Sequence, residues 1–188
     1  MFKIIKKLIN FSFIFFLFIG INHAISDDKI YLDLQNLVFE NKSNYKNYQT
    51  NSQLVIKTDL KKEIEDWTRK KIILKGKSGK LTVKILDESI IDSAVEEHRN
   101  KFSFLPKNGI AYKINFKIKI LGENLKNNSS AEVLSIVKGE QTFLGGFSIN
   151  DRSKVLDELM GSMIKKLKKN INSGINAEFK DFLTNKYN

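Results

Sequence analysis

Apolar and polar residues alternate without interruption in the segment AYKINFKIKIL, residues 111–121. A period of two is typical of a β-strand that buries one face and exposes the other. The pattern therefore predicts a strand over residues 110–121. Its apolar positions are Tyr112, Ile114, Phe116, Ile118 and Ile120, and its polar positions are Lys113, Asn115, Lys117 and Lys119.

Three further segments show the same alternation less strongly. Residues 30–34 predict a first strand, and residues 80–86 predict another that can continue to Ala94 past a kink near Asp87. Residues 131–143 predict a fourth strand, with Gly139 as a candidate bulge. The polar segments in between are expected to be a loop over residues 40–52, a connection over residues 96–108 and a turn over residues 122–130.

A helical period appears first over residues 59–74. Thr58 or Asp59 is a suitable N-cap, and Leu60, Ile64 and Trp67 fall on one face. Lysines at the end of this segment suit the negative end of a helix dipole. Because Trp67 shares the apolar face, we expect it to be a core side chain.

A second and longer helix is predicted after Ser148. The spacing from Ser148 to Asp151 matches a capping box with Asp in place of Glu. Gly174 is predicted to end this helix, before a short amphipathic helix over residues 175–183. The expected core stripe is Leu156, Leu159, Met160, Met163, Ile164, Leu167 and Ile171, and the opposite face is Lys154, Glu158, Lys165, Lys168 and Lys169.

The predicted element order is β-α-β-β-β-α. Short connections between the last three strands favour an antiparallel meander. Two helices with one apolar stripe each fit on one face of a four-stranded sheet, which predicts an α/β (α+β) two-layer sandwich with the other sheet face open. Both phases of residues 131–143 contain apolar residues, such as Leu134 and Ile136 beside Val133 and Val137. A sheet that is apolar on both faces there favours a dimer or a covered face, and the sequence leaves the oligomeric state open.

Residues 1–26 differ from the rest of the chain. Three lysines precede an almost wholly apolar run, and Ala24 and Ser26 place small residues before Asp27. This layout predicts a secretory signal peptide over residues 1–26, with a single domain over residues 27–188. We expect a periplasmic or secreted protein after signal cleavage; the alternative is an uncleaved signal that anchors the chain in the inner membrane. The chain has no Cys, so it has no site for a lipid on an N-terminal Cys and no disulfide.

The predicted mature chain is basic. Residues 27–188 carry 29 of the 32 Lys and Arg residues and all 21 acidic residues, a formal net charge of +8. Such a balance favours anionic partners, and export argues against nucleic acid, which leaves anionic lipid or lipopolysaccharide. The alternative is that much of this charge is solvated surface.

The residues that catalysis and metal binding usually need are scarce. His98 is the only His after the predicted signal, and its neighbours Glu96 and Glu97 point alternately in an extended chain. No nucleophile elbow or phosphate-binding glycine loop is present. We therefore expect no catalytic residues, no metal, no cofactor and no enzyme activity.

Two candidate binding surfaces remain. The first is the lysine face, defined as Lys80, Lys84, Lys113, Lys117 and Lys119, which alternation places on the open side of the sheet, where it can hold phosphates or carboxylates. Lysines also protect a solvated sheet face from aggregation. The second is the apolar tip, defined as Phe143, Leu144 and Phe147 around two glycines, which is either a flexible contact with a membrane or partner, or a buried staple at the start of a helix.

The segment WTRKKIILKGKSGKLTVKI (67–85) followed by DESI (87–90) resembles a family of exported, uncharacterised proteobacterial proteins. The element order over residues 54–183 is also similar to that of LptE-like and YajG-like envelope lipoproteins. This resemblance implies two helices on a four-stranded sheet and an accessory role in envelope transport or assembly. The chain departs from these lipoproteins because it has no lipobox Cys.

We therefore expect an exported accessory or binding protein of the cell envelope. Its expected partner is an anionic lipid, lipopolysaccharide or an envelope protein complex, with peripheral membrane contact. The alternative is a structural or protein-interaction module without a small-molecule or lipid ligand.

Overall fold

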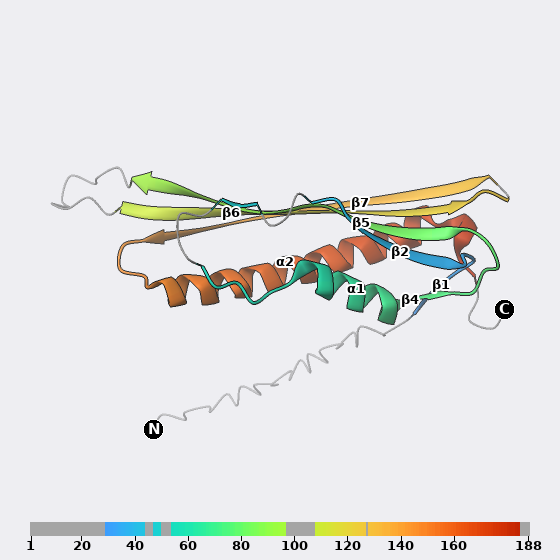
Figure 1. Cartoon of the computed structure of the whole chain (residues 1–188), viewed down its shortest axis with the longest axis horizontal. Helices are drawn as coiled ribbons and strands as arrows, with labels where there is room; N and C mark the ends of the chain where they lie inside the picture. The colour runs from blue at the N-terminus through green and yellow to red at the C-terminus, as the bar shows by residue number, and fades with distance from the viewer. Residues whose placement is uncertain (1–28, 44–46, 50–53, 97–107, 127, 185–188) are drawn as a thin grey trace, which may run out of the picture.

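The computed structural model describes residues 29–43, 47–49, 54–96, 108–126 and 128–184. It has two layers, a mixed β-sheet and a layer of helices on one of its faces, which confirms the predicted fold class (Figure 1). The predicted signal peptide, the connection over residues 97–107 and His98 lie outside the described residues. The helices of the described part are too short or too polar to cross a lipid bilayer.

The predicted meander forms the centre of the sheet. Strands β5 (Lys80–Glu96), β6 (Asn108–Asn124) and β7 (Ser129–Leu144) pair antiparallel in that order. The pairing of β5 with β6 shifts by one residue between Ile85 and Asp87, which is the kink expected near Asp87. This shift keeps apolar side chains on the covered face although the buried positions change from odd to even numbers, because Ile85 before it and Ile90 after it are both buried.

The outer lane beside β5 differs from the prediction. Strands β2 (Asn36–Asn41) and β3 (Asn47–Gln49) both pair parallel with β5, one after the other along its length. The expected loop over residues 40–52 is therefore wrong for Glu40, Asn41 and the residues of β3. Strands at the edge of a sheet bury few side chains, so their sequences can be polar and lack a clear alternation. In β2, for example, Leu37 and Phe39 are the side chains that pack against the core.

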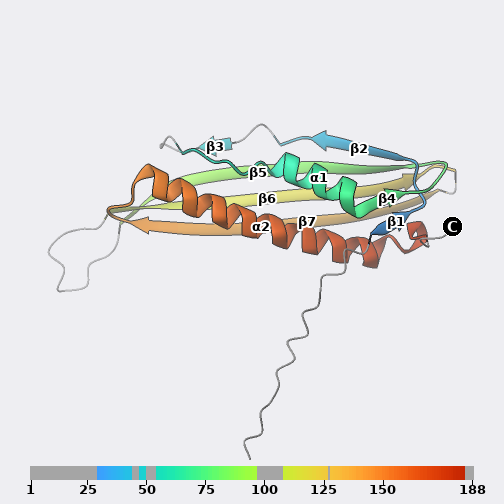
Figure 2. The ribbon, with the colours of Figure 1, turned by 90° about the horizontal axis from the view of Figure 1, so that it is seen from below.

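The first predicted strand does not belong to the main sheet. Strand β1 (Ile30–Leu32) pairs parallel with β4 (Ile72–Leu74) in a separate two-stranded sheet. Figure 2 shows this small pair on the helix side of the main sheet, close to the ends of both helices. Its apolar phase was predicted correctly, since Ile30, Leu32 and Leu34 are buried.

Helix α1 (Leu60–Lys71) begins at the N-cap Asp59, whose side chain accepts a hydrogen bond from the backbone N–H of Lys62 at 3.0 Å. It ends at Lys71 and not at residue 74, because Ile72 leaves the helix to start β4. Its apolar face packs on the sheet through Leu60 and Ile64, which are fully buried.

Helix α2 (Ile149–Glu178) begins at the predicted capping box. The hydroxyl of Ser148 accepts from the backbone N–H of Asp151 at 3.1 Å and donates to the Asp151 carboxylate at 2.6 Å. The predicted stripe faces the sheet, with Leu159 partly buried and its other members buried. Contrary to the prediction, α2 does not end at Gly174, and residues 175–178 continue it to the 3-10 helix η1 (Lys180–Phe182).

Two glycines serve close packing and not the roles that the sequence suggested. Gly139 is not a bulge, because β7 pairs with β6 in an unbroken register; a Cβ there would lie 2.6 Å from the sulfur of Met163. At Gly174 a Cβ would lie 2.5 Å from Cγ1 of Val133. Both glycines therefore let α2 lie directly against β7.

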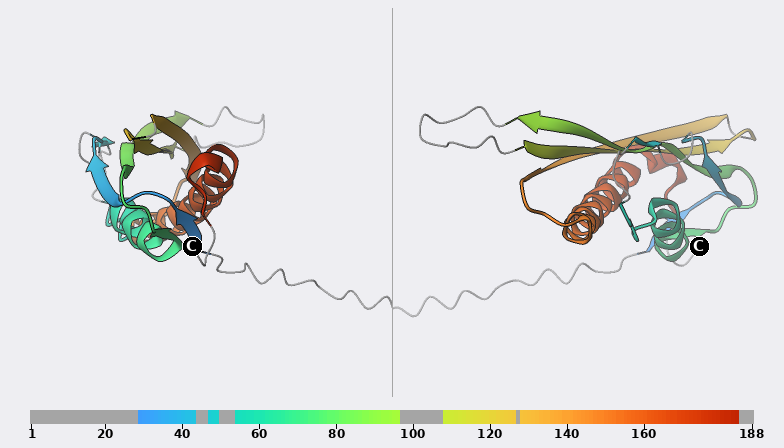
Figure 3. Two further views of the ribbon diagram at one scale, coloured as in Figure 1. Left: turned by 90° about the vertical axis from the view of Figure 1, so that its right-hand side faces the viewer. Right: turned by 60° about the vertical axis from the view of Figure 1, so that its left-hand side comes forward.

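Figure 3 shows that the helices cover one face of the sheet and leave the other free of described elements. The covered face and the helices enclose a continuous core of apolar side chains. The free face carries the polar phase of β6, as predicted, because Ile114, Ile118 and Ile120 are turned into the core.

Candidate functional site

The five residues of the predicted lysine face do lie on the free face of the sheet, but carboxylates accompany them. Lys80 pairs with Glu123 at 3.2 Å, Lys84 with Glu40 at 3.2 Å and Lys119 with Glu132 at 2.7 Å. The hydrogen bond from Lys84 lowers the pKa of Glu40 below its ordinary value, so this carboxylate stays charged beside the lysine.

Carboxylates are nearly as numerous as lysines across this face. The register adds Lys138 to the five predicted lysines, and it adds the following acids: Glu40, Asp87, Glu123, Glu132 and Glu140. Lys113 and Lys117 are its predicted members without an ion pair among the described residues. A face with mixed charge attracts anions less than five isolated lysines would, and its role in ligand binding stays a prediction.

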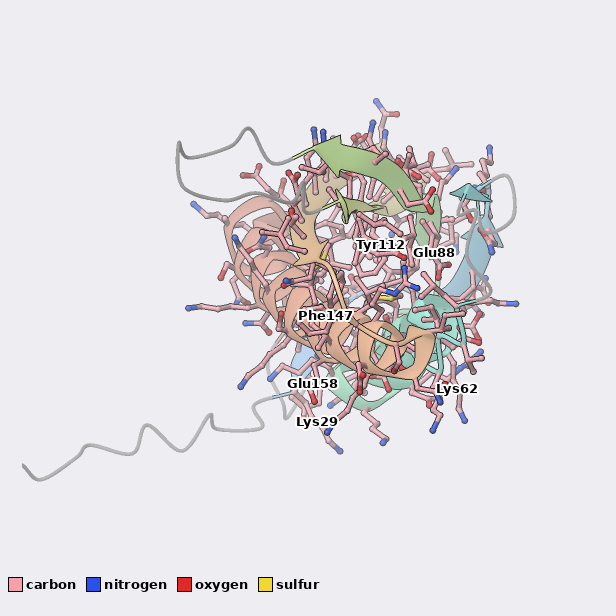
Figure 4. All side chains as sticks on the ribbon, turned by 90° about the vertical axis from the view of Figure 1, so that its left-hand side faces the viewer. Lys29, Lys62, Glu88, Tyr112, Phe147 and Glu158 are labelled. Atoms are coloured by element: carbon pink, nitrogen blue, oxygen red, sulfur yellow. The ribbon has the colours of Figure 1, made fainter. Side chains whose placement is uncertain are left out.

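The structure separates the three residues of the predicted apolar tip. Phe143 is buried, with ring contacts to Tyr112 and Phe147 at centroid distances of 5.8 Å and 5.2 Å. Leu144 and Phe147 are 40% and 50% exposed, on a turn whose glycines have positive φ. Viewed from this end, Figure 4 shows Tyr112 close to the sheet and Phe147 near the start of α2. Phe143 thus belongs to the core, while Leu144 and Phe147 remain available for contact.

The most distinctive surface is a groove on the helix side, which sequence reasoning did not find. It has a volume of about 1040 Å³ and lies among β1, α1 and α2. Its apolar residues are Ile30, Tyr31, Trp67 and Leu183, and its uncharged polar residues are Ser162, Asn172, Asn176 and Thr184. We call this surface the lysine groove, after its remaining residues: Lys29, Lys71, Lys165, Lys166, Lys168 and Lys169.

Three parts of the fold bring these lysines together. Lys71 ends α1, where the negative end of the helix dipole favours a cation. The run KKLKK (165–169) lies in α2, and the full burial of Leu167 turns its lysines away from the core. Lys29 directly precedes β1. The groove therefore depends on β1, α1 and α2 meeting in space.

No carboxylate lines the groove among the described residues. Lys168 reaches out to Glu63 of α1 at 2.7 Å, and no other groove lysine forms an ion pair with a described residue. The lysines thus leave an excess of positive charge concentrated around one concave surface, where it attracts anions most strongly.

The walls of the groove add two features that a ligand can use. Trp67 is half-buried: it packs against the core, as the sequence predicted, and it also lines the wall of the groove. The Oδ1 atom of Asn172 is buried without a hydrogen-bond partner among the described residues. Such an oxygen gains stability from a donor that a ligand supplies. Within the described part of the chain, no cluster of His, Cys, Asp and Glu has a geometry suited to a metal ion.

No protein-family model and no curated protein matches this sequence. Among solved structures, rare lipoprotein B from Shewanella oneidensis is 9% identical, with a TM-score of 0.41, and the match covers 76% of this chain and 96% of that one. A minor lipoprotein from Acinetobacter baumannii is 12% identical, with a TM-score of 0.37, and the match covers 82% and 98%. Envelope lipoproteins are therefore among the structures with a similar chain path, but similarity this weak carries no argument about function.

Proposed function

We propose that this protein is an exported, non-catalytic binding protein of the cell envelope, and that its ligand is an anionic amphiphile held in the lysine groove. The supporting observation is that one concavity combines an apolar wall with six lysines, of which five have no ion pair with a described residue. The export step rests on the signal peptide predicted from residues 1–26.

The charge of the groove selects the head group. Lysine ammonium groups form charge-assisted hydrogen bonds with phosphate and carboxylate oxygens. On the free sheet face, Glu123, Glu40 and Glu132 already occupy three lysines. Among the residues that the structure describes, Lys168 is the one groove lysine with such a partner. An anion gains more in the groove, because it has fewer internal carboxylates to displace.

The apolar wall selects a hydrocarbon chain beside that head group. Trp67, Ile30 and Leu183 offer apolar surface next to the lysines, and the aliphatic stems of the lysines extend it. The volume of about 1040 Å³ is slightly above the range of small-molecule pockets, roughly 300–1,000 Å³. A lipid with one negative head group and at least one acyl chain satisfies both parts of the groove.

Trp67 makes this proposal directly measurable, because it is the only Trp in the chain. The experiment follows its fluorescence while the purified protein is titrated with lysophosphatidylglycerol below its micelle concentration. Lysophosphatidylcholine serves as the neutral match, and inorganic phosphate as the head group alone. Lipopolysaccharide and vesicles with and without phosphatidylglycerol then distinguish a free lipid from a membrane surface as the source of the ligand.

We expect lysophosphatidylglycerol to shift the Trp67 emission to the blue and lysophosphatidylcholine to have a much smaller effect. Binding should weaken with salt, because the Debye length falls from about 10 Å at 0.1 M to about 3 Å at 1 M. A Lys165→Gln/Lys169→Gln variant should bind about 30-fold more weakly, since each lysine near an anionic lipid surface contributes about 1 kcal/mol.

The matched control is Lys113→Gln/Lys117→Gln, which removes the same charge from the sheet face. It should bind like the unmodified protein. If the control loses affinity and the groove variant keeps it, the lysine face is the ligand site and the groove proposal is wrong. If neutral and anionic lipids bind equally, or none binds, the groove does not select an anionic amphiphile and protein partners become the better explanation.

A further inference from the structure

Strand β7 forms one edge of the main sheet and has few of the usual protections of an edge. It is 16 residues long, and its register with β6 is unbroken by a bulge. It contains no proline, and β6 is its one strand neighbour among the described residues. The other edge, beside β5, is shared between the short strands β2 and β3. A long regular edge is a template for pairing with another strand.

The exposed phase of β7 is unusually apolar at its centre. Leu134 and Ile136 are 48% and 47% exposed on the free sheet face. Glu132 precedes this pair and Lys138 follows it, so the exposed phase reads acid, apolar, apolar, base. Such a sequence is complementary to itself when read in the opposite direction.

Two copies of β7 can pair antiparallel about a two-fold axis perpendicular to the sheet. In such a pair, the residue on the axis lies opposite the same residue of the second copy, and naming that residue defines the register. Residues that lie opposite each other point to the same face of the sheet. With Ser135 on the axis, Leu134 lies opposite Ile136 of the second copy. Glu132, which also pairs with Lys119 of its own chain, lies opposite Lys138 of the second copy, so each side of the axis has one apolar pair and one pair of opposite charges.

Neighbouring registers are poorer. With Ile136 on the axis, Glu132 opposes Glu140 of the second copy, and with Lys138 on the axis two lysines meet. A register centred on Gly139 pairs Lys138 with Glu140, but it places the Ser135 hydroxyl opposite Phe143. Like charges directly opposite are destabilising, and a polar group opposite a phenyl ring gains no partner.

Ser135 itself provides an independent observation. It is 3% exposed, and its hydroxyl has no hydrogen-bond partner among the described residues. A buried hydroxyl without a partner costs stability in the isolated chain. On the two-fold axis the two Ser135 hydroxyls lie side by side, and each can donate to or accept from the other.

From these observations we infer that the protein forms a homodimer in which β7 of one copy pairs antiparallel with β7 of the other, with Ser135 on the two-fold axis. The two sheets become one continuous sheet, and the helices of both copies lie on its same side. Figure 2, a view from the helix side, shows α2 running obliquely across the strands with its own C-terminal half along β7, so the two α2 helices approach each other. The stripe of α2 opposite to Asn172 and Asn176 is exposed and has short side chains there, Asn170, Ser173 and Ala177, which permit this approach.

Because the chain has no Cys, a single introduced Cys tests the axis directly. Opposed residues of antiparallel strands have Cα atoms about 4.5–5.5 Å apart, which a disulfide can span. In the protein purified from cells that express the full chain, Ser135→Cys should form a disulfide-linked dimer under mild oxidation. Glu140→Cys is the control. In this register the two residues 140 of the dimer are ten positions apart along the strands, about 33 Å, so this variant should stay uncrosslinked.

Sedimentation of charge variants provides a second readout that does not depend on a buried substitution. Glu132→Lys and Lys138→Glu should each weaken dimerisation about tenfold, since each change places like charges opposite each other at two symmetric positions. The variant with both changes restores opposite charges and should dimerise like the unmodified protein.

A chain that stays monomeric at all concentrations tested overturns the dimer. Equal crosslinking of the two Cys variants, or failure of the double charge variant to recover, overturns the register. The proposal does not depend on the lysine groove, which lies on the other side of α2.

Discussion

Two glycines in α2 allow the same substitution to be tested in two environments. Sequence reasoning predicts that Gly174 ends a helix, whereas in the structure it packs against Val133. Gly161 lies in the same helix, exposed, with no atom within 4 Å of an added Cβ. Replacing each by Ala separates the helix propensity of the backbone from the space available to the side chain.

At Gly161 the substitution changes the free energy of unfolding through helix propensity, because the new side chain has no neighbour to contact. Ala is more favourable than Gly inside a helix by about 1 kcal/mol, so Gly161→Ala should raise the free energy of unfolding by about that amount. In a protein of 188 residues this corresponds to a rise in Tm of roughly 2–4 °C.

At Gly174 the same gain is opposed by overpacking. The new Cβ would lie 2.5 Å from Cγ1 and 3.0 Å from Cγ2 of Val133, a buried β-branched residue with little freedom to rotate. Overpacking a core costs about 1–3 kcal/mol. Gly174→Ala should therefore range from neutral to about 2 kcal/mol destabilising, and the two variants should differ by about 1–3 kcal/mol.

Urea unfolding monitored by circular dichroism measures this difference through the transition midpoints, provided that the slopes agree. In a Val133→Ala background, which removes both methyl groups, the cost of Gly174→Ala should disappear. If Gly174→Ala stabilises the protein as much as Gly161→Ala does, α2 does not pack on β7 at this point, and the reasoning from close approach is refuted.

Two further changes test local contacts of α2. The Asp157 carboxylate accepts hydrogen bonds from the backbone N–H groups of Lys57 at 3.0 Å and Thr58 at 2.9 Å. Asp157→Asn should therefore lower the free energy of unfolding, measured in urea titrations, by about 1–3 kcal/mol. The control is Glu158→Gln, a change at an exposed neighbouring residue, which should leave the free energy of unfolding almost unchanged. Ser148→Ala removes the N-cap and should lower stability by about 0.5–2 kcal/mol, whereas Ser148→Asp should retain most of it; equal thermal midpoints for both variants would argue against a functioning cap.

Period-two and helical patterns predicted the elements of the sheet centre and both helices, because one face of each element is buried. The alternation around Tyr112 and the stripe around Leu156 are the clearest cases. The kink near Asp87 was visible because the apolar phase changes there. By contrast, β2 and β3 escaped detection, because edge strands with polar residues have little of the pattern that burial imposes.

The candidate site was harder to predict than the fold. The lysine face followed from alternation alone, but the carboxylates that pair with Lys80, Lys84 and Lys119 come from other strands. The lysine groove was missed because the KKLKK run was assigned to a solvated helix face. A Trp at the edge of an apolar helix face, next to this run of lysines, was the signal that could have indicated a groove wall as well as a core contact.

The order of residues alone determined what depends on neighbours along the chain: the buried phase around Tyr112, the apolar stripes, the cap at Ser148, the choice of Thr58 or Asp59 as the cap of the first helix, and the absence of Cys. Tertiary structure decided what depends on distant segments meeting in space. It placed β1 beside β4, gave Gly139 and Gly174 their packing roles, and gathered lysines from three elements around Trp67. The physical reason is that hydrophobic periodicity specifies which side of an element is buried, but not which other element buries it.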